Sequence, residues 1–543
     1  AGSVIAYEED KIFSVLPTNG DGDFTFTGGD GGTRVNQQGY VEQTPANFML
    51  NSGTTWNVNN VTITTGVTDP VGGTGAYTIG SIASGNITEY VNKASNAMSL
   101  PAGTVITYSI YMKGSGTIAT YLERSVGGTY WFNVKTHTLS SEWQVFTHSY
   151  TVPTDASGFT VYVGNATTST ATSVDIAFPM VNYGSTARPY QPTTDRLNYP
   201  RITYQNGRGA LLSEPQRTNL NLYSTGPTGS FTTAGAANSD GRYYYSKAVL
   251  NNKTSLSPDG TDNAYEMLMH DSSYDMYTRF NGLTIGASMV FSMYVKLGTA
   301  RNFCVVVNNT TAWNTVARSV FAAPELSDQH YTRVDVPFTV PSSGQVNIHL
   351  GGHSEAMTQQ SAGTVFLYGS QMEVGSYLTS YTPTTTSTVT RPNTTILSTT
   401  SVINNSEGTL HFDFSYMGSG SGYLVWAIDD GSNVNRVQAE VNFSNNTLNW
   451  VLVSGNSLQA YFSSTGLVRG QRYKAALDYK VNDVCGYLNG VKQFQDNAAT
   501  MPTGMNKYAI GAQGGSFSYP GGNIYTTAYF NSSQTDAQLA ELT

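Results

Sequence analysis

Short stretches in which hydrophobic and polar residues alternate recur along the whole chain. Examples are residues 107–113 (TYSIYMK) and 291–296 (FSMYVK), where every second side chain points to the same face of an extended strand. Gly, Ser, Thr and Asn separate these stretches and favour tight turns. Only residues 533–542 predict a helix, with a capping residue and leucines at i and i+3. The pattern predicts an all-β chain of tandem antiparallel β-sandwiches, or jelly rolls, after a short extended N-terminal segment.

Two long stretches of the chain repeat the same elements in the same order. Each alternating strand is followed by a strand that ends at a proline, which has no N–H to donate to a sheet, and then by a further strand. Both copies have similar beginnings and similar ends, so the repeat covers whole domains, which we place at 46–194 and 217–385. The paired segments are RVN (34–36) and RIT (201–203), NFML (47–50) and NLNL (219–222), Pro153 and Pro341, FTVYV (159–163) and VNIHL (346–350), PMVNYGS (179–185) and QMEVGS (371–376), and YQPT (190–193) and YTPT (381–384).

The remainder of the chain differs from the two copies. Residues 398–543 contain a strand at 473–479 and an Asn489-Gly490 dipeptide that suits a type I′ hairpin turn, so we predict a third sandwich with a short C-terminal helix. Residues 386–397 are polar and extended and are predicted as a linker. Residues 1–45 are predicted as an attachment segment, and residues 195–216 as an Arg-rich connector.

Composition supports this class and excludes others. The 543 residues include 55 Gly and 36 Tyr, only 12% are charged, and the formal net charge of -9 argues against binding to nucleic acid. Only Cys304 and Cys485 occur, in different predicted domains, so no disulfide framework is expected. The chain has no apolar run long enough for a membrane-spanning helix, and its start lacks the features of a signal peptide, so we expect synthesis in the cytoplasm and no membrane insertion.

The motifs resemble a known family. The domain ends at 371–376 and 381–384, the segment LLSEPQRTNL (211–220) and the N-terminal pieces IFSVLP (12–17) and GDFTFT (22–27) resemble virion-associated head and tail fibre proteins of tailed bacteriophages, with carbohydrate-binding-module-like sandwiches. The C-terminal part is similar to concanavalin A-like or laminin-G-like, lectin-like jelly rolls, through GTLHFDF (408–414), YLNG (487–490) and 522–542.

The resemblance implies a structural protein of the virion surface that adheres to host glycans. It implies other virion proteins as partners through residues 1–45, synthesis in the host bacterial cytoplasm, and a homo-oligomer, with a trimer favoured over a dimer.

A search for catalytic residues finds none. His349 and His353 are four apart, but they lie in a strand pattern that places them about 13 Å apart, which is too far for a shared metal ion. Asp429 and Asp430 are adjacent and point to opposite faces of an extended chain, unlike the paired carboxylates of a glycosidase. With Asn433 in the same loop they are a candidate calcium site, against the simpler reading of an acidic turn. No other cofactor is expected.

Aromatic residues in turns are the candidates for stacking on sugar rings. They lie beside Gly, Ser and Asn, whereas Trp143, Trp426 and Trp450 lie in strand patterns and are predicted to be core. The competing reading is that tyrosine-rich surfaces make contacts between subunits. The candidates are Tyr130, Trp131, Trp313, Tyr243, Tyr245, Phe517 and Tyr519.

Five arginines gather in and beside the connector of the first two predicted domains, at 188, 196, 201, 208 and 217. Two interpretations are open: solvated loop charge, or a clamp that docks on carboxylates. Taken together, the sequence predicts a non-enzymatic phage fibre protein that binds glycans. The alternatives are a phage polysaccharide-degrading enzyme and a bacterial surface adhesin.

Overall fold

The structure is a computed structural model. For Tyr130, Trp131, Tyr243, Tyr245 and Phe517 it describes the backbone and not the side chain. The described residues are 5–8, 11–14, 25–27, 32–43, 47–49, 52–53, 56–83, 88–95, 105–126, 129–151, 159–166, 168–187, 190, 201–205, 207–224, 243–245, 249–260, 264–269, 274–311, 314–351, 362–384, 387–399, 403–513, 516–517 and 521–543.

The fold is almost entirely antiparallel β-sheet, which confirms the predicted fold class. The chain forms two compact units: Pro45–Tyr199, and Ala1–Thr44 together with Pro200–Thr543. None of the helices in the described residues is long and apolar enough to cross a membrane.

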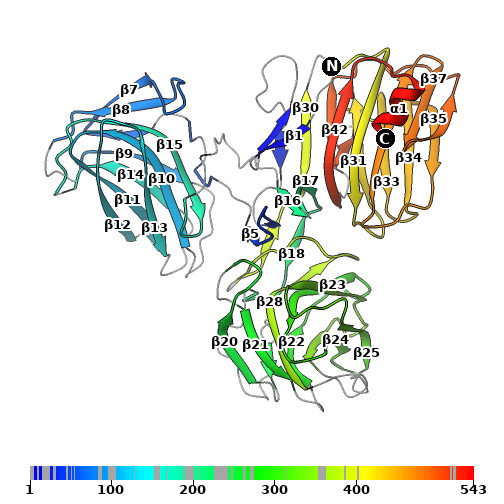
Figure 1. Cartoon of the computed structure of the whole chain (residues 1–543), viewed down its shortest axis with the longest axis horizontal. Coiled ribbons are helices and arrows are strands. Elements are labelled where there is room, and N and C mark those ends of the chain that lie inside the picture. Colours follow the sequence, from blue (N-terminus) through cyan, green and yellow to red (C-terminus); the bar gives the residue numbers. More distant parts are fainter. Residues whose placement is uncertain are drawn as a thin grey trace. The chain divides into compact units, whose positions relative to one another are not determined.

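The first unit contains a sandwich of two five-stranded sheets (Figure 1). Their inward side chains, among them Ile110 and Val161, form one buried hydrophobic cluster. One sheet has the order β13-β10-β15-β8-β7 and comprises β7 (Thr62–Val67), β8 (Ala76–Gly80), β10 (Val105–Gly114), β13 (Gln144–Thr151) and β15 (Val174–Tyr183). The other has the order β12-β11-β14-β9-β6 and comprises β6 (Asn57–Asn59), β9 (Tyr90–Ser95), β11 (Thr117–Val126), β12 (Thr129–Thr138) and β14 (Phe159–Gly164).

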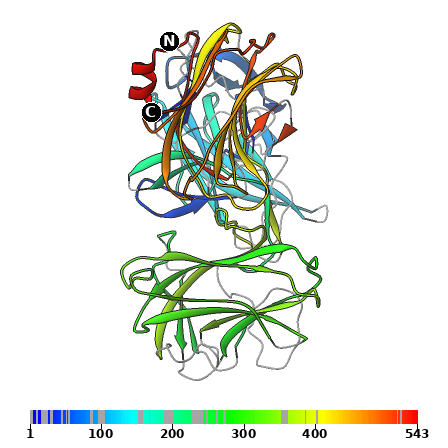
Figure 2. The same cartoon turned by 90° about the vertical axis from the view of Figure 1, so that its right-hand side faces the viewer.

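A second sandwich in the other unit has the same strand order in both sheets, and its two layers appear in green in Figure 2. Phe291 and Ile348 belong to its hydrophobic cluster. One sheet, β26-β23-β28-β21-β20, comprises β20 (Val249–Ser255), β21 (Ala264–Met269), β23 (Ser288–Leu297), β26 (Thr332–Thr339) and β28 (Gly363–Val374). The other, β25-β24-β27-β22-β19, comprises β19 (Tyr243–Tyr245), β22 (Tyr274–Phe280), β24 (Asn302–Asn309), β25 (Thr315–Ala322) and β27 (Val346–Gly351).

The two sandwiches also share hydrogen bonds at equivalent positions. The side-chain oxygen of Asn47 accepts the N–H groups of Met49 and Val181, and that of Asn219 accepts the N–H groups of Asn221 and Met372. A buried amide thus joins the start of each sandwich to its last long strand, so the similarity extends to the chemistry that closes each copy.

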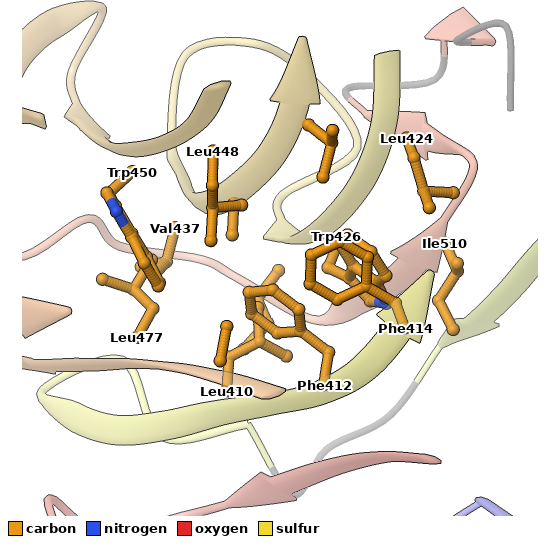
Figure 3. Packing of buried hydrophobic residues seen from close by; sticks show 14 of the residues in the cluster. Leu410, Phe412, Phe414, Leu424, Trp426, Val437, Leu448, Trp450, Leu477 and Ile510 are labelled. Atoms are coloured by element: carbon orange, nitrogen blue, oxygen red, sulfur yellow. The ribbon is translucent and has the colours of Figure 1, made fainter. Parts of the chain in front are cut away.

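A pair of seven-stranded sheets forms the third sandwich. Trp426 and Trp450 are fully buried, as predicted, and Figure 3 shows Phe412 and Phe414 packed against Trp426, with the Phe412 and Trp426 rings stacked 4.4 Å apart. One sheet, β16-β17-β42-β31-β36-β37-β38, comprises β16 (Ile202–Gln205), β17 (Arg208–Ser213), β31 (Glu407–Tyr416), β36 (Arg472–Lys480), β37 (Asp483–Leu488), β38 (Val491–Asp496) and β42 (Gly522–Phe530). The other, β3-β30-β39-β32-β33-β34-β35, comprises β3 (Thr25–Thr27), β30 (Thr395–Thr399), β32 (Tyr423–Asp429), β33 (Arg436–Asn442), β34 (Thr447–Ser454), β35 (Ser457–Ser464) and β39 (Lys507–Ile510).

Segments that the sequence predicts as connections are strands in the structure. Residues of the predicted linker form β29 and β30, and Ile396 is fully buried, because β30 completes a sheet with β3 from the N-terminal segment. Residues of the predicted connector form β16 and β17, which extend the opposite sheet. The remaining strands form two-stranded sheets: β1 (Ile5–Glu8) with β2 (Lys11–Ser14), β4 (Thr33–Val35) with β5 (Val41–Gln43), β18 (Arg217–Asn219) with β29 (Val389–Arg391), and β40 (Ala512–Gln513) with β41 (Ser516–Phe517).

Two local predictions near the C-terminus are confirmed. Asn489 and Gly490 join β37 to β38 with φ values of 48° and 79°, as a type I′ turn requires. Helix α1 (Asp536–Leu542) begins at Thr535, whose hydroxyl accepts the N–H of Gln538 in a capping box.

A chain of polar side chains crosses the core of the first sandwich. Thr120 Oγ1 lies 2.8 Å from His137 Nε2 and 3.0 Å from His148 Nδ1, and His148 Nε2 lies 2.6 Å from Asn133 Oδ1. Burial together with Lys135 lowers the pKa of each histidine to about 4, so both rings are neutral at pH 7. In that state His148 donates from Nε2 to the amide oxygen and accepts from the Thr120 hydroxyl, which in turn accepts from His137.

Acid is expected to destabilise this sandwich selectively. The folded-state pKa of each histidine lies below its unfolded value near 6.5, so the unfolded chain binds protons first as the pH falls. The free energy of unfolding of the first sandwich should be highest above pH 6.5 and should fall towards pH 4. Hydrogen exchange of the β11–β13 amides in the whole chain measures this change. The variant H148Q should weaken this pH dependence, and H330Q, at an exposed histidine, should leave it unchanged. An equal pH dependence in the two variants would refute the buried histidines as its cause.

Candidate functional site

The aromatic residues predicted to bind sugar lie on backbone that the structure describes only in part. Tyr130 and Trp131 are in β12, Tyr243 and Tyr245 in β19, and Phe517 in β41, without described side chains. Trp313 and Tyr519 lie outside the described residues. Their role in glycan binding stays a prediction.

The proposed calcium loop is a hydrogen-bonded turn. The Asp429 carboxylate accepts the N–H of Gly431 at 2.7 Å, and Asp430 accepts the Ser432 N–H and hydroxyl and, at 2.9 Å, the Asn435 amide. Asn433 is exposed. Within the described part of the chain no three His, Cys, Asp or Glu side chains gather as metal ligands. The carboxylates serve the turn, and calcium binding here stays a prediction.

Arg201 is part of a buried ion network, so for this residue the reading as solvated loop charge is wrong. Its guanidinium lies 2.8 Å from the Glu214 carboxylate, and Arg391 lies 3.6 Å from the same carboxylate. The Ser380 N–H and hydroxyl both donate to Glu214 at 2.6 Å. Arg217 also faces a carboxylate, that of Glu373, at 3.8 Å. Arg188 and Arg196 lie outside the described residues.

The charges of this network persist at neutral pH. Burial by itself raises the pKa of a carboxyl group, but Arg391, Arg201 and the Ser380 hydrogen bonds lower the pKa of Glu214 to about 2. Burial lowers the pKa of Arg391 to about 10, still well above neutrality. One carboxylate thus lies between two fully buried guanidinium groups and offsets one of their two positive charges. The network joins Glu214, which follows β17, with Arg391 on β29 and with Arg201, which precedes β16.

A similar arginine–glutamate pair holds the hairpin β4–β5, hereafter the leading hairpin. Arg34 lies 2.8 Å from Glu42 across it, as Arg201 does from Glu214 across β16–β17. The leading hairpin comes before the first sandwich in the chain, yet it packs on the second. Thr33 donates to the Tyr381 carbonyl oxygen at 2.9 Å, and Val41 joins a buried cluster there.

The leading hairpin covers an aromatic face on the outer side of the β23 sheet. Tyr294, Tyr368 and Tyr381 gather there with ring centroids 5.8–6.3 Å apart, and Tyr381 is fully buried. A cavity of about 310 Å³, lined in part by Tyr294, Tyr381 and Arg333, remains beside the hairpin. Most of this face is therefore closed by the chain itself.

The first sandwich presents the equivalent aromatic face in a different form. Tyr111 and Tyr190 correspond to Tyr294 and Tyr381, and Tyr190 keeps the same hydrogen bond, to Ser52 at 2.9 Å, that Tyr381 makes to Ser224. Phe178 stacks on Tyr190 at 4.6 Å and meets the Tyr111 ring edge-on at 5.7 Å. All three rings are half-buried and lie outside the core cluster. We call Tyr111, Phe178 and Tyr190 the aromatic platform.

Phe178 adopts a backbone conformation that its side chain disfavours. Its φ of 53° is left-handed, and Tyr223 is the only other aromatic residue with positive φ among the described residues. The equivalent position in the second sandwich is Gly369, with a φ of 63°, for which this conformation has little cost. A bulky residue there costs on the order of 1–3 kcal/mol. The bulge residues are Ala177-Phe178 in one copy and Tyr368-Gly369 in the other, so the aromatic and small residues are exchanged.

Polar groups lie along the same outer face. Lys113 and Asp175 are paired across β10 and β15 at 3.5 Å and remain partly exposed, and Thr78 donates to Asp175 from β8. Trp143, predicted as core, is only partly buried, with the Lys113 ammonium 5.0 Å from its ring centre. Aromatic rings next to hydrogen-bonding groups are the combination that sugar recognition uses.

Sequence reasoning missed the platform because it favoured aromatics beside turns. The available signal was the repeat itself, since a gap-free alignment of Gly184-Ser185 with Gly375-Ser376 places Phe178 opposite Gly369. A phenylalanine aligned with a glycine inside a strand indicates either a changed backbone or a retained strain.

The comparisons with known proteins give similarity to carbohydrate-binding modules of solved structure. A CBM40 of Ruminococcus gnavus IT-sialidase is 15% identical, with 26% of this chain and 84% of that one covered and a TM-score of 0.23. The CBM22-1-CBM22-2 tandem of Paenibacillus barcinonensis Xyn10C is 13% identical, with 64% of this chain and 98% of that one covered and a TM-score of 0.24. Domain 4 of the Geobacillus stearothermophilus arabinanase AbnA is 14% identical, with 28% of this chain and 72% of that one covered and a TM-score of 0.24. No family model and no curated protein matches the chain. At these values the likeness carries no argument about ligand or activity.

Removing the Glu214 charge should destabilise the unit that contains it. The variant E214Q leaves Arg201 and Arg391 buried without a counter-charge, which costs about 3–5 kcal/mol. Calorimetric unfolding should show a lower transition temperature for that unit. The control E407Q removes a carboxylate from the exposed pair with Lys480, at 3.8 Å, and should change stability by less than about 1 kcal/mol. Equal effects of the two variants would contradict the network.

Proposed function

We propose that this chain is a non-enzymatic, glycan-binding adhesive protein, and that the aromatic platform of the first sandwich is one of its binding sites. The observation that carries the proposal is the strained backbone of Phe178. The equivalent position in the second sandwich is Gly369, so the fold accepts glycine there without this strain. A backbone strain retained where the scaffold does not need it points to a role of the side chain.

The geometry of the platform suits a pyranose ring. The Phe178 and Tyr190 rings are within 14° of parallel, and the Tyr111 ring and the Ser52 hydroxyl hold them in place, so little conformational entropy is lost when a sugar stacks on them. The Ser52 hydroxyl fixes the Tyr190 phenol, and burial raises the pKa of Tyr190, which keeps it neutral. Lys113 and Asp175 supply a donor and an acceptor for sugar hydroxyls on the same face.

We further propose that the protein is a head or tail fibre of a bacteriophage, displayed on the virion surface as a homo-oligomer. Support comes from the sequence resemblance of 12–17, 22–27 and 211–220 to such fibres. Repeated copies would raise the avidity of weak individual sites. Antibodies against the chain should label intact particles in electron micrographs, and labelling of bacterial envelopes in uninfected cells would instead indicate a bacterial adhesin.

The test of the platform is the substitution F178G, which installs the residue of the second sandwich. Loss of the ring contacts and relief of the strain offset each other, so the unfolding temperature of the first sandwich should change little. Binding to the glycan selected on an array with the whole chain should fall about tenfold or more, equivalent to about 1.4 kcal/mol, as measured by calorimetry.

A control and a contrary result complete this test. The variant Y423A removes a ring that is 39% exposed in the third sandwich and should leave the affinity unchanged. Unchanged affinity in F178G would refute the platform as the site. Release of new reducing ends from host polysaccharide would refute the non-enzymatic assignment.

A further inference from the structure

A polar cleft lies on the outer face of the third sandwich, on the sheet that contains β36. The cleft has a volume of about 480 Å³, and its lining includes Arg208, Asp413, Arg472, Lys474 and Asn489. Along β36 the exposed Lys474 alternates with the buried Tyr473 and Ala475, so the inner face fills the core while the outer face remains available.

The cleft has a defined wall and floor. Helix α1 packs on the neighbouring part of the same outer face, where Leu539 is buried against Tyr487 and Cys485. Asn489 accepts the backbone N–H of Lys474 at 3.0 Å, which ties the β37–β38 turn to β36 beside the cleft. This hydrogen bond between a side chain and the backbone fixes the position of the turn beside the cleft.

The side chains that line the cleft carry a surplus of positive charge. Asp413 is buried and binds the Arg472 guanidinium in a bidentate pair, with 2.6 Å between Arg472 Nε and the carboxylate, so these two charges offset each other. Arg472 also lies 4.3 Å from the ring centre of Tyr525. Arg208 and Lys474 are exposed, and neither side chain forms an ion pair or hydrogen bond with any residue that the structure describes. Two cations are left over in a chain whose net charge is -9.

The spacing of these cations indicates an extended ligand. Arg208 is on β17 and Lys474 on β36, and β42 and β31 lie between these strands. At about 4.8 Å per strand, the two backbones are roughly 14 Å apart. A single inorganic anion contacts one such cation at a time, whereas an oligosaccharide with charged units spans both. The Tyr525 ring on β42 lies between the two cations, and the Asn489 amide lies on the other side of Lys474, so they provide a surface for ring faces and a group for sugar hydroxyls.

We propose that this cleft binds an acidic oligosaccharide, with carboxylates of separate sugar units held by Arg208 and Lys474. Arg472, fixed by Asp413, presents a stacked guanidinium–tyrosine surface to the sugar rings. A nucleic acid, which carries a denser charge, is opposed by the acidic field of the rest of the chain. The site is separate from the aromatic platform and does not depend on it.

The test uses the whole chain and a tetramer of galacturonic acid as the probe, in calorimetry at low salt. The wild type should bind the tetramer, bind the monomer at least tenfold more weakly, and lose affinity as salt is added. The variant R208Q/K474Q should reduce tetramer affinity tenfold or more. The control R469Q/K480Q, which removes two exposed cations of the same sandwich, should retain it.

Several results would overturn the proposal. They are equal loss in both double variants, equal binding of a neutral tetramer of glucose, competition by inorganic phosphate as strong as that by the tetramer, and no binding of the galacturonate probe. The variant F178G should keep its affinity for the probe, and R208Q/K474Q should keep its affinity for the glycan bound at the platform. The two proposals can therefore be refuted independently of each other.

Discussion

The Glu214 carboxylate, shared between Arg201 and Arg391, is the interaction on which the larger unit depends. Three buried charges are stable there because the carboxylate faces both guanidinium groups and because Ser380 adds two hydrogen bonds to it. The network joins segments that lie far apart in the chain. Gly32 lies against it, since a Cβ there would come within 2.5 Å of Arg391, so the leading hairpin docks only with glycine at that point.

Duplication gave the two five-stranded sandwiches one scaffold and two surfaces. The buried amides of Asn47 and Asn219 and the hydroxyl contacts of Tyr190 and Tyr381 are common to both. At the bulge the sequences diverge, and the second copy uses glycine with a tyrosine beside it under the leading hairpin. The first copy has the aromatic residue at the strained position. The same sheet face is thus part of the interior in one copy and a candidate recognition surface in the other.

The sequence predicted the strands well, because period-two alternation is a local property of each strand. It also predicted the Asn489-Gly490 turn and helix α1, whose signals lie within a few residues. It failed where partners are distant, as with β3 and β30, which pair across about 370 residues, and with Arg391, which looked like part of a polar linker but is fully buried. For the site, composition drew attention to turn aromatics, whereas Phe178 is distinguished by its φ angle, which no local pattern reveals.

The architecture also restricts where ligands can bind. Inward faces of all three sandwiches are filled by hydrophobic clusters, so recognition is confined to outer faces, loops and junctions. On the outer faces, folding requires only polar side chains that water can solvate, and Ser and Thr meet this requirement without backbone strain or buried charge. Two features go beyond this requirement: the strain at Phe178, and the cations of Arg208 and Lys474, which have no ion-pair partner among the residues that the structure describes. Neither feature increases the stability of the fold. We therefore explain both features by the binding of a ligand.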